Sequence, residues 1–271
     1  MHELRELLQG GPGDPGLDVA ALQIATVEYP EIFPSSFVEL LDSYGRELKE
    51  RVNPTADGEE FIQTMNEYLF EELGFQGNQD DYYHPANSCL NEVLTKRTGI
   101  PISLSVVYME IARRVGRKVH GIGLPGHFIV QYEDADITAF IDPFHAGRLM
   151  FETECYELAH EITGLDISSD STVLKPVSKR QILIRMLNNL RSVYFQRQQP
   201  LKAIEVLNLL IEADPGSPDE YKQRGVCLAQ VNRFAQARAD LEAYLKLSPD
   251  AADREPVSQQ IERINRYLAA L

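Results

Sequence analysis

The three cysteines of this sequence are its strongest nucleophiles, and their spacing limits the chemistry that they can do. Cys89, Cys155 and Cys227 stand far apart and are odd in number, which argues against a disulfide framework and against a paired-cysteine metal site. Cys89 begins a short helical segment, whereas Cys155 and Cys227 fall on helix faces, where thiols commonly pack in the core. We therefore expect reduced thiols in a cytoplasmic protein.

Histidines form the second group of side chains that could do chemistry. His84, His127 and His145 belong to the same region of the chain and together offer three imidazoles to a zinc ion. Their spacing matches no ligand motif, however, so we predict no metal and no cofactor. Hydroxyls are the remaining candidates, and Ser103 and Ser105 stand close together in the segment RTGIPISLSVVYMEIARRVG.

That segment, residues 97–116, predicts an amphipathic helix that begins at Pro101. Proline is favoured at the first helical position, because its fixed φ suits a helix and its missing N–H is not needed there. Ser103 lies half a turn further along, where a hydroxyl commonly hydrogen-bonds the local backbone. The start of this helix therefore has the composition of a well-capped structural element.

Helices precede this segment and short strands follow it. The runs VHGIGL, HFIVQY and TAFIDP are β-branched or aromatic and are separated by turn-forming residues, so they predict antiparallel strands. Residues 1–17 are polar and rich in Gly and Pro, and we interpret them as a loose tail. Helices followed by a run of strands indicate an α+β domain over about 1–176. The further predicted helices are 17–28, 34–52, 58–73, 89–97 and 153–163.

The last third of the chain contains an internal repeat. Its period of 34 residues is typical of the tetratricopeptide repeat, in which each unit is a pair of antiparallel helices. We predict an all-α domain over about 180–271, with repeats at about 184–217 and 218–251 and a capping helix over 257–271. The residue pairs that carry the period are Ala203 and Ala237, Leu207 and Leu241, and Pro215 and Pro249.

The net charge of −15 is unevenly distributed. Residues 180–271 hold 13 Lys/Arg against 11 Asp/Glu, whereas the rest of the chain holds 13 against 30. Such an acidic chain disfavours nucleic acid, and no apolar run approaches the ~20 residues that span a membrane. The N-terminus also lacks the apolar core of a signal peptide. We predict a protein or peptide partner, bound through the repeats.

Three motifs resemble a known family. The block NSCLNEVLTKRTGIPISLSVVYMEIARRVG, followed by LPGHFIVQY and FIDPFHAGRL, resembles the SirB family of bacterial proteins, which join a transglutaminase-like domain to C-terminal tetratricopeptide repeats. The resemblance implies a papain-like fold for the first domain. The wider transglutaminase-like superfamily uses a Cys–His–Asp triad, with the Cys at the start of a helix, the His opening one strand and the Asp on the next.

The resemblance also implies where this triad would lie. His127 in HFIVQY matches the strand histidine, and Asp142 in IDPF matches the aspartate. When Ser105 and Gly116 are matched to the small residue and the Gly of the superfamily helix, Pro101 falls where the Cys should be. Proline offers no nucleophile and no backbone N–H for an oxyanion, a donor whose loss costs about 10²–10³ in rate.

We therefore predict a non-catalytic interaction or regulatory protein, a pseudoenzyme whose cleft binds without turnover. His127 and Asp142 are expected to be hydrogen-bonded neighbours on adjacent strands, beside the helix that begins at Pro101. Asn87 and Asn91 are expected to line the mouth of the same cleft. In this interpretation the pair acts structurally or holds a ligand, because no nucleophile stands beside it.

The alternative is a hydrolase or acyltransferase in which Ser103 or Cys89 attacks a substrate, with His127 as the base and Asp142 as its partner. We favour structural roles for both nucleophile candidates, since short hydroxyls commonly cap helices and isolated cysteines are commonly buried. In a third interpretation the first domain is a scaffold and only the repeats have a function.

Overall fold

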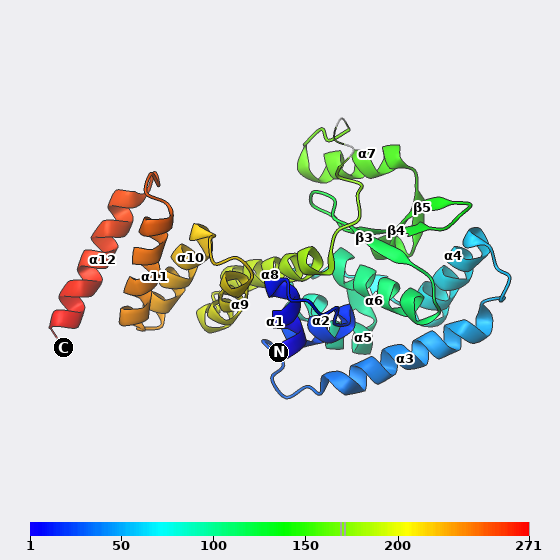
Figure 1. The fold of residues 1–271 in the computed structure, drawn as a ribbon, viewed down its shortest axis with the longest axis horizontal. Helices are drawn as coiled ribbons and strands as arrows, with labels where there is room; N and C mark the ends of the chain where they lie inside the picture. The colour runs from blue at the N-terminus through cyan, green and yellow to red at the C-terminus, as the bar shows by residue number, and fades with distance from the viewer. Residues whose placement is uncertain (169, 171, 271) are drawn as a thin grey trace. The chain divides into compact units, whose positions relative to one another are not determined.

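The computed structural model describes residues 1–168, 170 and 172–270 and divides the chain into two compact units. The first unit holds Met1, Glu3 and Asp14–Met186, and the second holds His2, Leu4–Gly13 and Leu187–Leu271. The first combines helices with a small antiparallel sheet, whereas the regular elements of the second are helices (Figure 1). The α+β class with a helical repeat region is thus confirmed. Among the described residues, no helix is long and apolar enough to cross a membrane.

The loose tail predicted for residues 1–17 is wrong. His2–Gln9 form helix α1, in which Leu4 and Leu8 are fully buried. Arg5 of this helix pairs with Glu212 at 2.9 Å. Leu4 and Leu8 lie one helical turn apart and form an apolar stripe. The stripe is short and is followed directly by Gly and Pro residues, so the sequence pattern favours a loop. The predicted domain limits, 1–176 and 180–271, stay predictions.

Helix α6 is the central element of the first unit. It is buried along almost its whole length, because it packs against α3 on one side and against strands β3 and β4 on the other. The helix predicted over 58–73 changes at Glu67 into a π-helix, a wider turn that the sequence pattern does not reveal. The helices before the sheet are α2 (Leu17–Ala25), α3 (Pro34–Arg51), α4 (Gly58–Asn66), the π-helix η1 (Glu67–Glu72), α5 (Leu90–Lys96) and α6 (Pro101–Arg114).

A buried ionic network fixes the C-terminal end of α6. The side chain of Arg114 pairs with Asp18 of α2 at 2.5 Å, with Asp42 of α3 at 2.7 Å and with Glu110 at 2.8 Å. Gly45 of α3 permits this contact, since a Cβ atom there would lie 2.6 Å from Cβ of Arg114. Burial, together with the neighbouring Asp18, raises the pKa of Glu110. The network therefore ties three helices together at a position remote from the Pro101 end.

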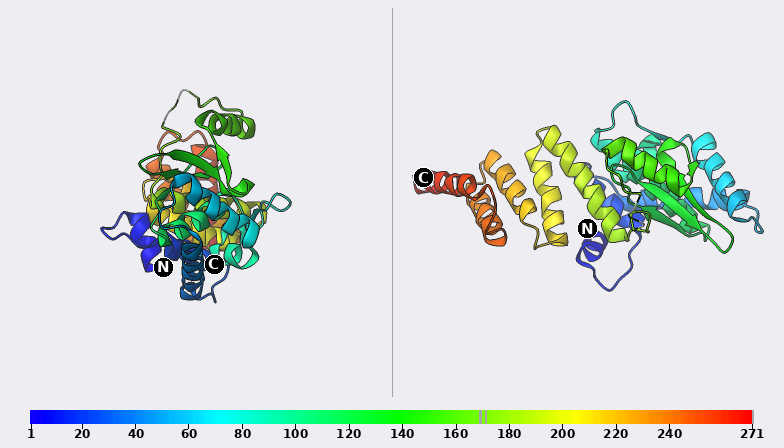
Figure 2. Two further views of the ribbon diagram at one scale, coloured as in Figure 1. Left: turned by 90° about the vertical axis from the view of Figure 1, so that its right-hand side faces the viewer. Right: turned by 90° about the horizontal axis from the view of Figure 1, so that it is seen from above.

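The sheet has the order β3–β4–β5–β6, and all neighbouring strands are antiparallel. One face packs against α6, and the other packs against helix α7 (Glu152–Thr163) through an apolar cluster that includes Ile129, Phe140 and Cys155 (Figure 2). The edge strand β6 was not predicted, because three residues are too few to show an alternating pattern. The strands of this sheet are β3 (Val119–Ile122), β4 (Ile129–Glu133), β5 (Thr138–Asp142) and β6 (Arg148–Met150). A separate parallel pair joins β1 (Gln76–Gly77) to β2 (Thr98–Gly99).

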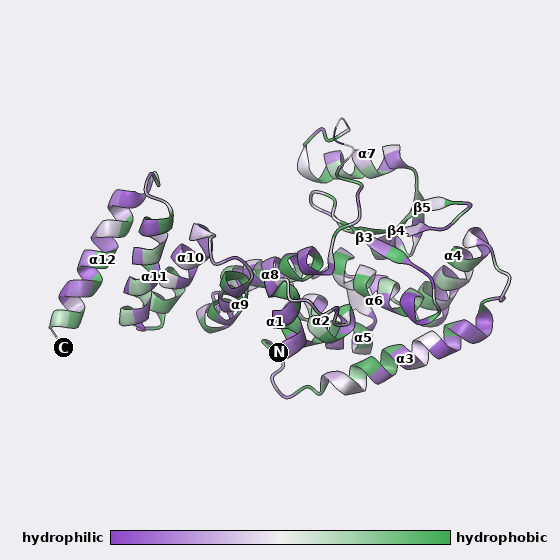
Figure 3. Ribbon diagram, in the orientation of Figure 1, coloured by the Kyte–Doolittle hydropathy of each residue, from purple (hydrophilic) through white to green (hydrophobic). Residues whose placement is uncertain are grey.

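The second unit stacks paired helices, as the repeat period predicts. Gly225 of α10 lets α11 approach closely, since a Cβ atom there would lie 3.0 Å from Cγ of Leu241. Helix α12 is largely hydrophilic (Figure 3), and Val257 and Ile264 are its buried residues, as expected of a capping helix. The helices are α8 (Lys179–Gln196), whose residues up to Met186 belong to the first unit, α9 (Pro200–Ala213), α10 (Pro218–Gln230), α11 (Phe234–Leu247) and α12 (Arg254–Ala269).

Candidate functional site

His127 lies in the turn between β3 and β4, two residues before β4 begins. Gly126 precedes it with a φ of +72°, a conformation that glycine adopts without strain. The backbone N–H of His127 donates to the carbonyl of Leu124 at 3.2 Å, which closes the turn. The imidazole is brought inside the unit, and the residue is only 4% exposed.

Arg185 of α8 holds this turn from the outside. Its guanidinium donates to the carbonyl oxygens of Leu124 and His127, at 2.8 and 2.5 Å, and lies over the ring of Phe128. Burial lowers the pKa of Arg185, because removing the charged guanidinium from water costs free energy. The backbone of His127 is therefore positioned by a residue far along the chain, which sequence reasoning missed.

Asp142 ends β5 and organises the other half of the site. Its Oδ1 accepts the backbone N–H of Phe144 at 3.0 Å, and this bond caps the short 3₁₀-helix η3 (Pro143–His145). Its Oδ2 lies 2.8 Å from Nε2 of His127. The predicted hydrogen bond between His127 and Asp142 is thus confirmed, and both partners are buried. The predicted place of His127 on a strand is wrong, because β4 begins only at Ile129.

His145 is a second imidazole partner of the same carboxylate. Its Nδ1 lies 2.7 Å from Oδ2 of Asp142, and its ring stacks on that of His127 with centroids 5.8 Å apart. Burial acts to raise the pKa of Asp142, but the two imidazoles outweigh it and hold that pKa below its usual range. Asp142 is therefore an ionised acceptor shared by two histidines, one buried and one whose side chain is 41% exposed.

Pro101 begins α6, as predicted, and Ser103 caps it. The hydroxyl of Ser103 accepts the backbone N–H of Ile100 at 3.0 Å and donates to the carbonyl of Asn87 at 2.6 Å. The serine is fully buried. Its hydroxyl therefore satisfies backbone groups, which is the structural role favoured from the sequence, and it makes no hydrogen bond to His127.

The remaining predicted site residues also serve the fold. Asn87 holds the loop before η2 (Pro85–Ser88), since its side-chain amide donates to the carbonyls of Asp81 and Tyr82. Asn91 is buried in α5, and its Oδ1 has no hydrogen-bond partner among the residues that the structure describes. Cys89 is fully buried at the start of that helix. Their roles in a cleft or in catalysis stay predictions.

The zinc trio weighed from the sequence does not assemble within the described residues. His84 uses its Nδ1 to accept the backbone N–H of Ala86. Instead His127, Asp142 and His145 place their ligand atoms within 4.8 Å of one another. These atoms are already hydrogen-bonded to each other, so a metal ion would have to replace those bonds.

The chemistry open to this arrangement is limited by what surrounds His127. An imidazole oriented by a carboxylate is half of a triad and can act as a base when a hydroxyl or thiol lies within hydrogen-bond reach. Within the described part of the chain, no hydroxyl or thiol forms a hydrogen bond to the ring of His127. Burial also raises the pKa of Cys155 to about 12 and that of Cys227 above its usual value, as expected of packed, unreactive thiols.

Comparisons with known proteins match both units. The family model of the transglutaminase-like superfamily matches residues 35–188, and a tetratricopeptide-repeat model matches residues 190–262. A UPF0162 protein of Xylella fastidiosa is 36% identical over 232 residues, which cover 84% of this chain and 83% of the relative. The chain belongs to the UPF0162 family of transglutaminase-like proteins. Another UPF0162 protein, from Pseudomonas aeruginosa, is 30% identical and covers 91% of this chain and 90% of its own.

Two further similarities reach beyond the UPF0162 family. Human F-box only protein 21 is 33% identical over 141 residues, which cover 49% of this UPF0162 chain and 21% of the human protein. Among solved structures, menin aligns at 11% identity with a TM-score of 0.42, over 96% of this chain and 72% of menin. The latter likeness is too remote to support any inference.

Proposed function

We propose that this UPF0162 protein binds a protein partner and turns over no substrate at the His127 site. The observation that carries the proposal is Pro101 at the first position of α6, where the superfamily places its nucleophile. Proline supplies neither a thiolate nor the N–H that stabilises an oxyanion. The bonding of Asp142 to two imidazoles supports a structural use of the retained pair.

The partner site that we propose is a cavity in the repeats, which we call the repeat groove. It measures about 610 Å³ and lies between the C-terminal end of α8 and the face of α10. Phe195 and Val226 expose apolar surface in it, at 38% and 37%. The polar part of its lining includes Gln198 and Gln230, whose side chains can donate to and accept from the backbone of a bound peptide.

The charge of the repeat groove favours an acidic or mixed-charge segment. Among the described residues of its lining, Lys222 is the charged one, and none is Asp or Glu. Lys222 already pairs with Asp253. A carboxylate of the partner would therefore have to compete with Asp253 for the ammonium group of Lys222. Binding through such a contact should weaken as salt rises.

A capture experiment tests the repeat groove. The protein carrying Phe195→Ser and Val226→Ser should lose the partner that the wild type retains from a cell lysate. The matched control carries Leu201→Ser and Leu247→Ser, which remove exposed apolar side chains of the same unit outside the groove, and it should retain that partner. If the groove variant captures as much partner as the wild type, the repeat groove is not the binding site.

A hydrolase or acyltransferase that uses Ser103 or Cys89 with His127 and Asp142 remains the second candidate, and the retained His127–Asp142 pair is what favours it. Peptidase, amidase and transamidase assays on purified protein decide between the two. Activity that survives purification and disappears in His127→Ala would overturn binding without turnover.

We also infer membership of the SirB family from the motifs around Pro101, His127 and Asp142. The inferred cytoplasmic location rests on the cysteine pattern, and the inferred lack of nucleic-acid and membrane partners rests on the acidic charge.

A further inference from the structure

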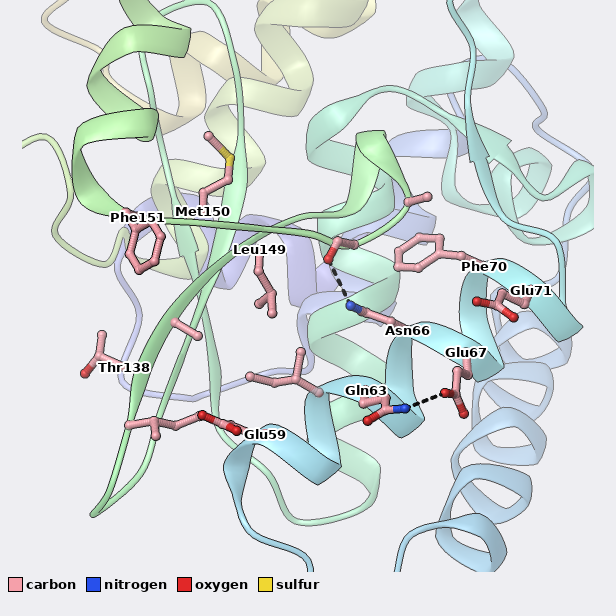
Figure 4. A pocket seen from close by; sticks show the side chains of 15 residues that line it. Glu59, Gln63, Asn66, Glu67, Phe70, Glu71, Thr138, Leu149, Met150 and Phe151 are labelled. Carbon is pink, nitrogen blue, oxygen red and sulfur yellow. Dashed lines mark hydrogen bonds between the residues drawn. The ribbon is translucent and has the colours of Figure 1, made fainter.

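A groove of about 950 Å³ lies in the first unit, and none of His127, Asp142 and Pro101 lines it. Helix α4 and the π-helix η1 form one wall, and strands β5 and β6 with the loop before β6 form the other (Figure 4). We call it the acidic groove. Nothing in the proposed roles of the repeats or of the His127 site accounts for it.

The strand wall of the acidic groove exposes large apolar side chains. Leu149 of β6 is 57% exposed and Phe151, directly after β6, is 79% exposed. Both side chains line the groove (Figure 4). Phe70, which is half-buried, adds apolar surface from the opposite wall, where Ile62 is buried beneath it in the lining. A contiguous exposed apolar surface between two walls is typical of a binding site for another molecule.

The helix wall carries negative charge that nothing in the groove neutralises. Glu59, Glu67 and Glu71 line it, and the lining includes no Lys, Arg or His. Within the described residues none of the three carboxylates forms an ion pair, and Glu67 accepts only the side-chain amide of Gln63. Carboxylates without counter-ions beside an apolar surface complement a ligand that is both apolar and cationic.

The two walls are held in place before any ligand binds. Asn66 lies where α4 meets η1, and its side chain donates to the carbonyl of Gly147 at 2.9 Å while accepting the hydroxyl of Tyr108 at 3.2 Å. A Cβ atom at Gly147 would lie 2.5 Å from Asn66, so glycine is required for this contact. A groove whose walls are fixed in this way spends little free energy on ordering itself when it binds.

We propose that the acidic groove binds a segment of a partner protein in which apolar side chains are flanked by Lys or Arg. Its volume is at the upper end for small-molecule sites, about 300–1,000 Å³, and admits several side chains of one segment. The proposal does not depend on whether His127 is catalytic, nor on the repeat groove, whose lining has the opposite charge preference.

Binding of fluorescent peptides to the full-length protein tests the proposal. One probe has a Leu/Phe core flanked by arginines, the second has the same core flanked by glutamates, and the third keeps the arginines around a Gly/Ser core. The first should bind at least about tenfold more tightly than either of the others. If the third binds as well as the first, the contact is general attraction to an acidic protein and the proposal fails.

Two pairs of substitutions locate the site. Leu149→Ser with Phe151→Ser should weaken the first probe by at least about tenfold, whereas Leu165→Ser with Phe33→Ser, which remove side chains of matching exposure elsewhere in the unit, should leave it unchanged. Equal affinities for the two doubly substituted proteins would overturn the proposal.

Charge reversal and self-association complete the test. Glu67→Lys with Glu71→Lys should shift the preference to the glutamate-flanked probe, and an unchanged preference would contradict the role of these carboxylates. If the protein binds none of the probes but dimerises, and Leu149→Ser with Phe151→Ser makes it monomeric, the groove belongs to a second copy and the partner proposal is wrong. Circular dichroism of each variant verifies that it is folded.

Discussion

Replacing Asp142 with Asn removes the one charge that both imidazoles share, with almost no change in shape. The Asn side-chain oxygen can still accept the N–H of Phe144, so the cap of η3 is retained. The bond from Nε2 of His127 loses its ionised acceptor in a buried position, which costs about 1.5–3 kcal/mol. The bond from His145 is worth less, about 0.2–1 kcal/mol, because its side chain is 41% exposed. We therefore expect Asp142→Asn to lower the free energy of unfolding by about 2–4 kcal/mol.

The same charge makes the effect depend on pH. Since the pKa of Asp142 is held below its usual range in the folded protein, its contribution is complete above the unfolded value of about 3.9 and is lost as the pH falls through the folded value. The difference in stability between the wild type and Asp142→Asn should thus be fully present at about pH 5–6 and should narrow below about pH 4.

Hydrogen exchange of the β4 and β5 amides measures this difference, because it reports the first unit even if the two units unfold separately. Urea denaturation at a series of pH values then measures how the difference in the free energy of unfolding narrows as the pH falls below about 4. The matched control is Asp166→Asn, which changes an exposed aspartate that hydrogen-bonds Ser168 and should have little effect. The reasoning is refuted if Asp142→Asn is as stable as this control, or if the difference stays constant down to about pH 3.

Three further substitutions or reactions test separate parts of the structure. Ser103→Ala should destabilise the first unit by about 1–3 kcal/mol in urea denaturation, because it removes the hydroxyl that bonds the N–H of Ile100 and the carbonyl of Asn87. Ser105→Ala removes an equally buried hydroxyl that has no partner among the described residues and should cost little, so equal losses would contradict the capping role of Ser103. Cys155 and Cys227 should resist iodoacetamide in the native protein at about pH 8 and react once the protein is unfolded, since burial raises both thiol pKa values; native labelling seen by mass spectrometry would contradict this. Leu8→Ala should destabilise the second unit by about 2–5 kcal/mol and clearly more than Leu7→Ala, whose side chain is only partly buried; a smaller effect at Leu8 would mean that α1 is not packed as described.

The elements that the sequence predicts well are those whose signals are local and repeated. Apolar spacing predicts α3 and α6, alternating β-branched and aromatic residues predict β4 and β5, and the repeat period predicts the helices of the second unit. The pairing of His127 with Asp142 is predicted by the resemblance to the transglutaminase-like superfamily. The number of residues between them does not by itself indicate that they are in contact.

The features that the sequence does not predict depend on contacts between distant residues. Strand β6 is defined by pairing with β5, and the partnership of His145 with Asp142 depends on the turn of η3, where Ala146 adopts a φ of +52°. The role of Arg185 depends on a helix that begins more than fifty residues after the turn that it holds. None of these contacts leaves a periodic pattern in the sequence.

Helix α1 has a consequence for the order of events during synthesis. It is translated long before its partners, since Leu4–Gly13 belong to the unit that is completed by residues from Leu187 onward. Translation at about 5–20 residues per second separates the two by roughly ten to forty seconds. A helix of eight residues has little stability alone, so Leu4 and Leu8 remain open to chaperones and proteases until the repeats emerge. Whether newly made α1 survives thereby depends on residues that are translated almost two hundred positions later.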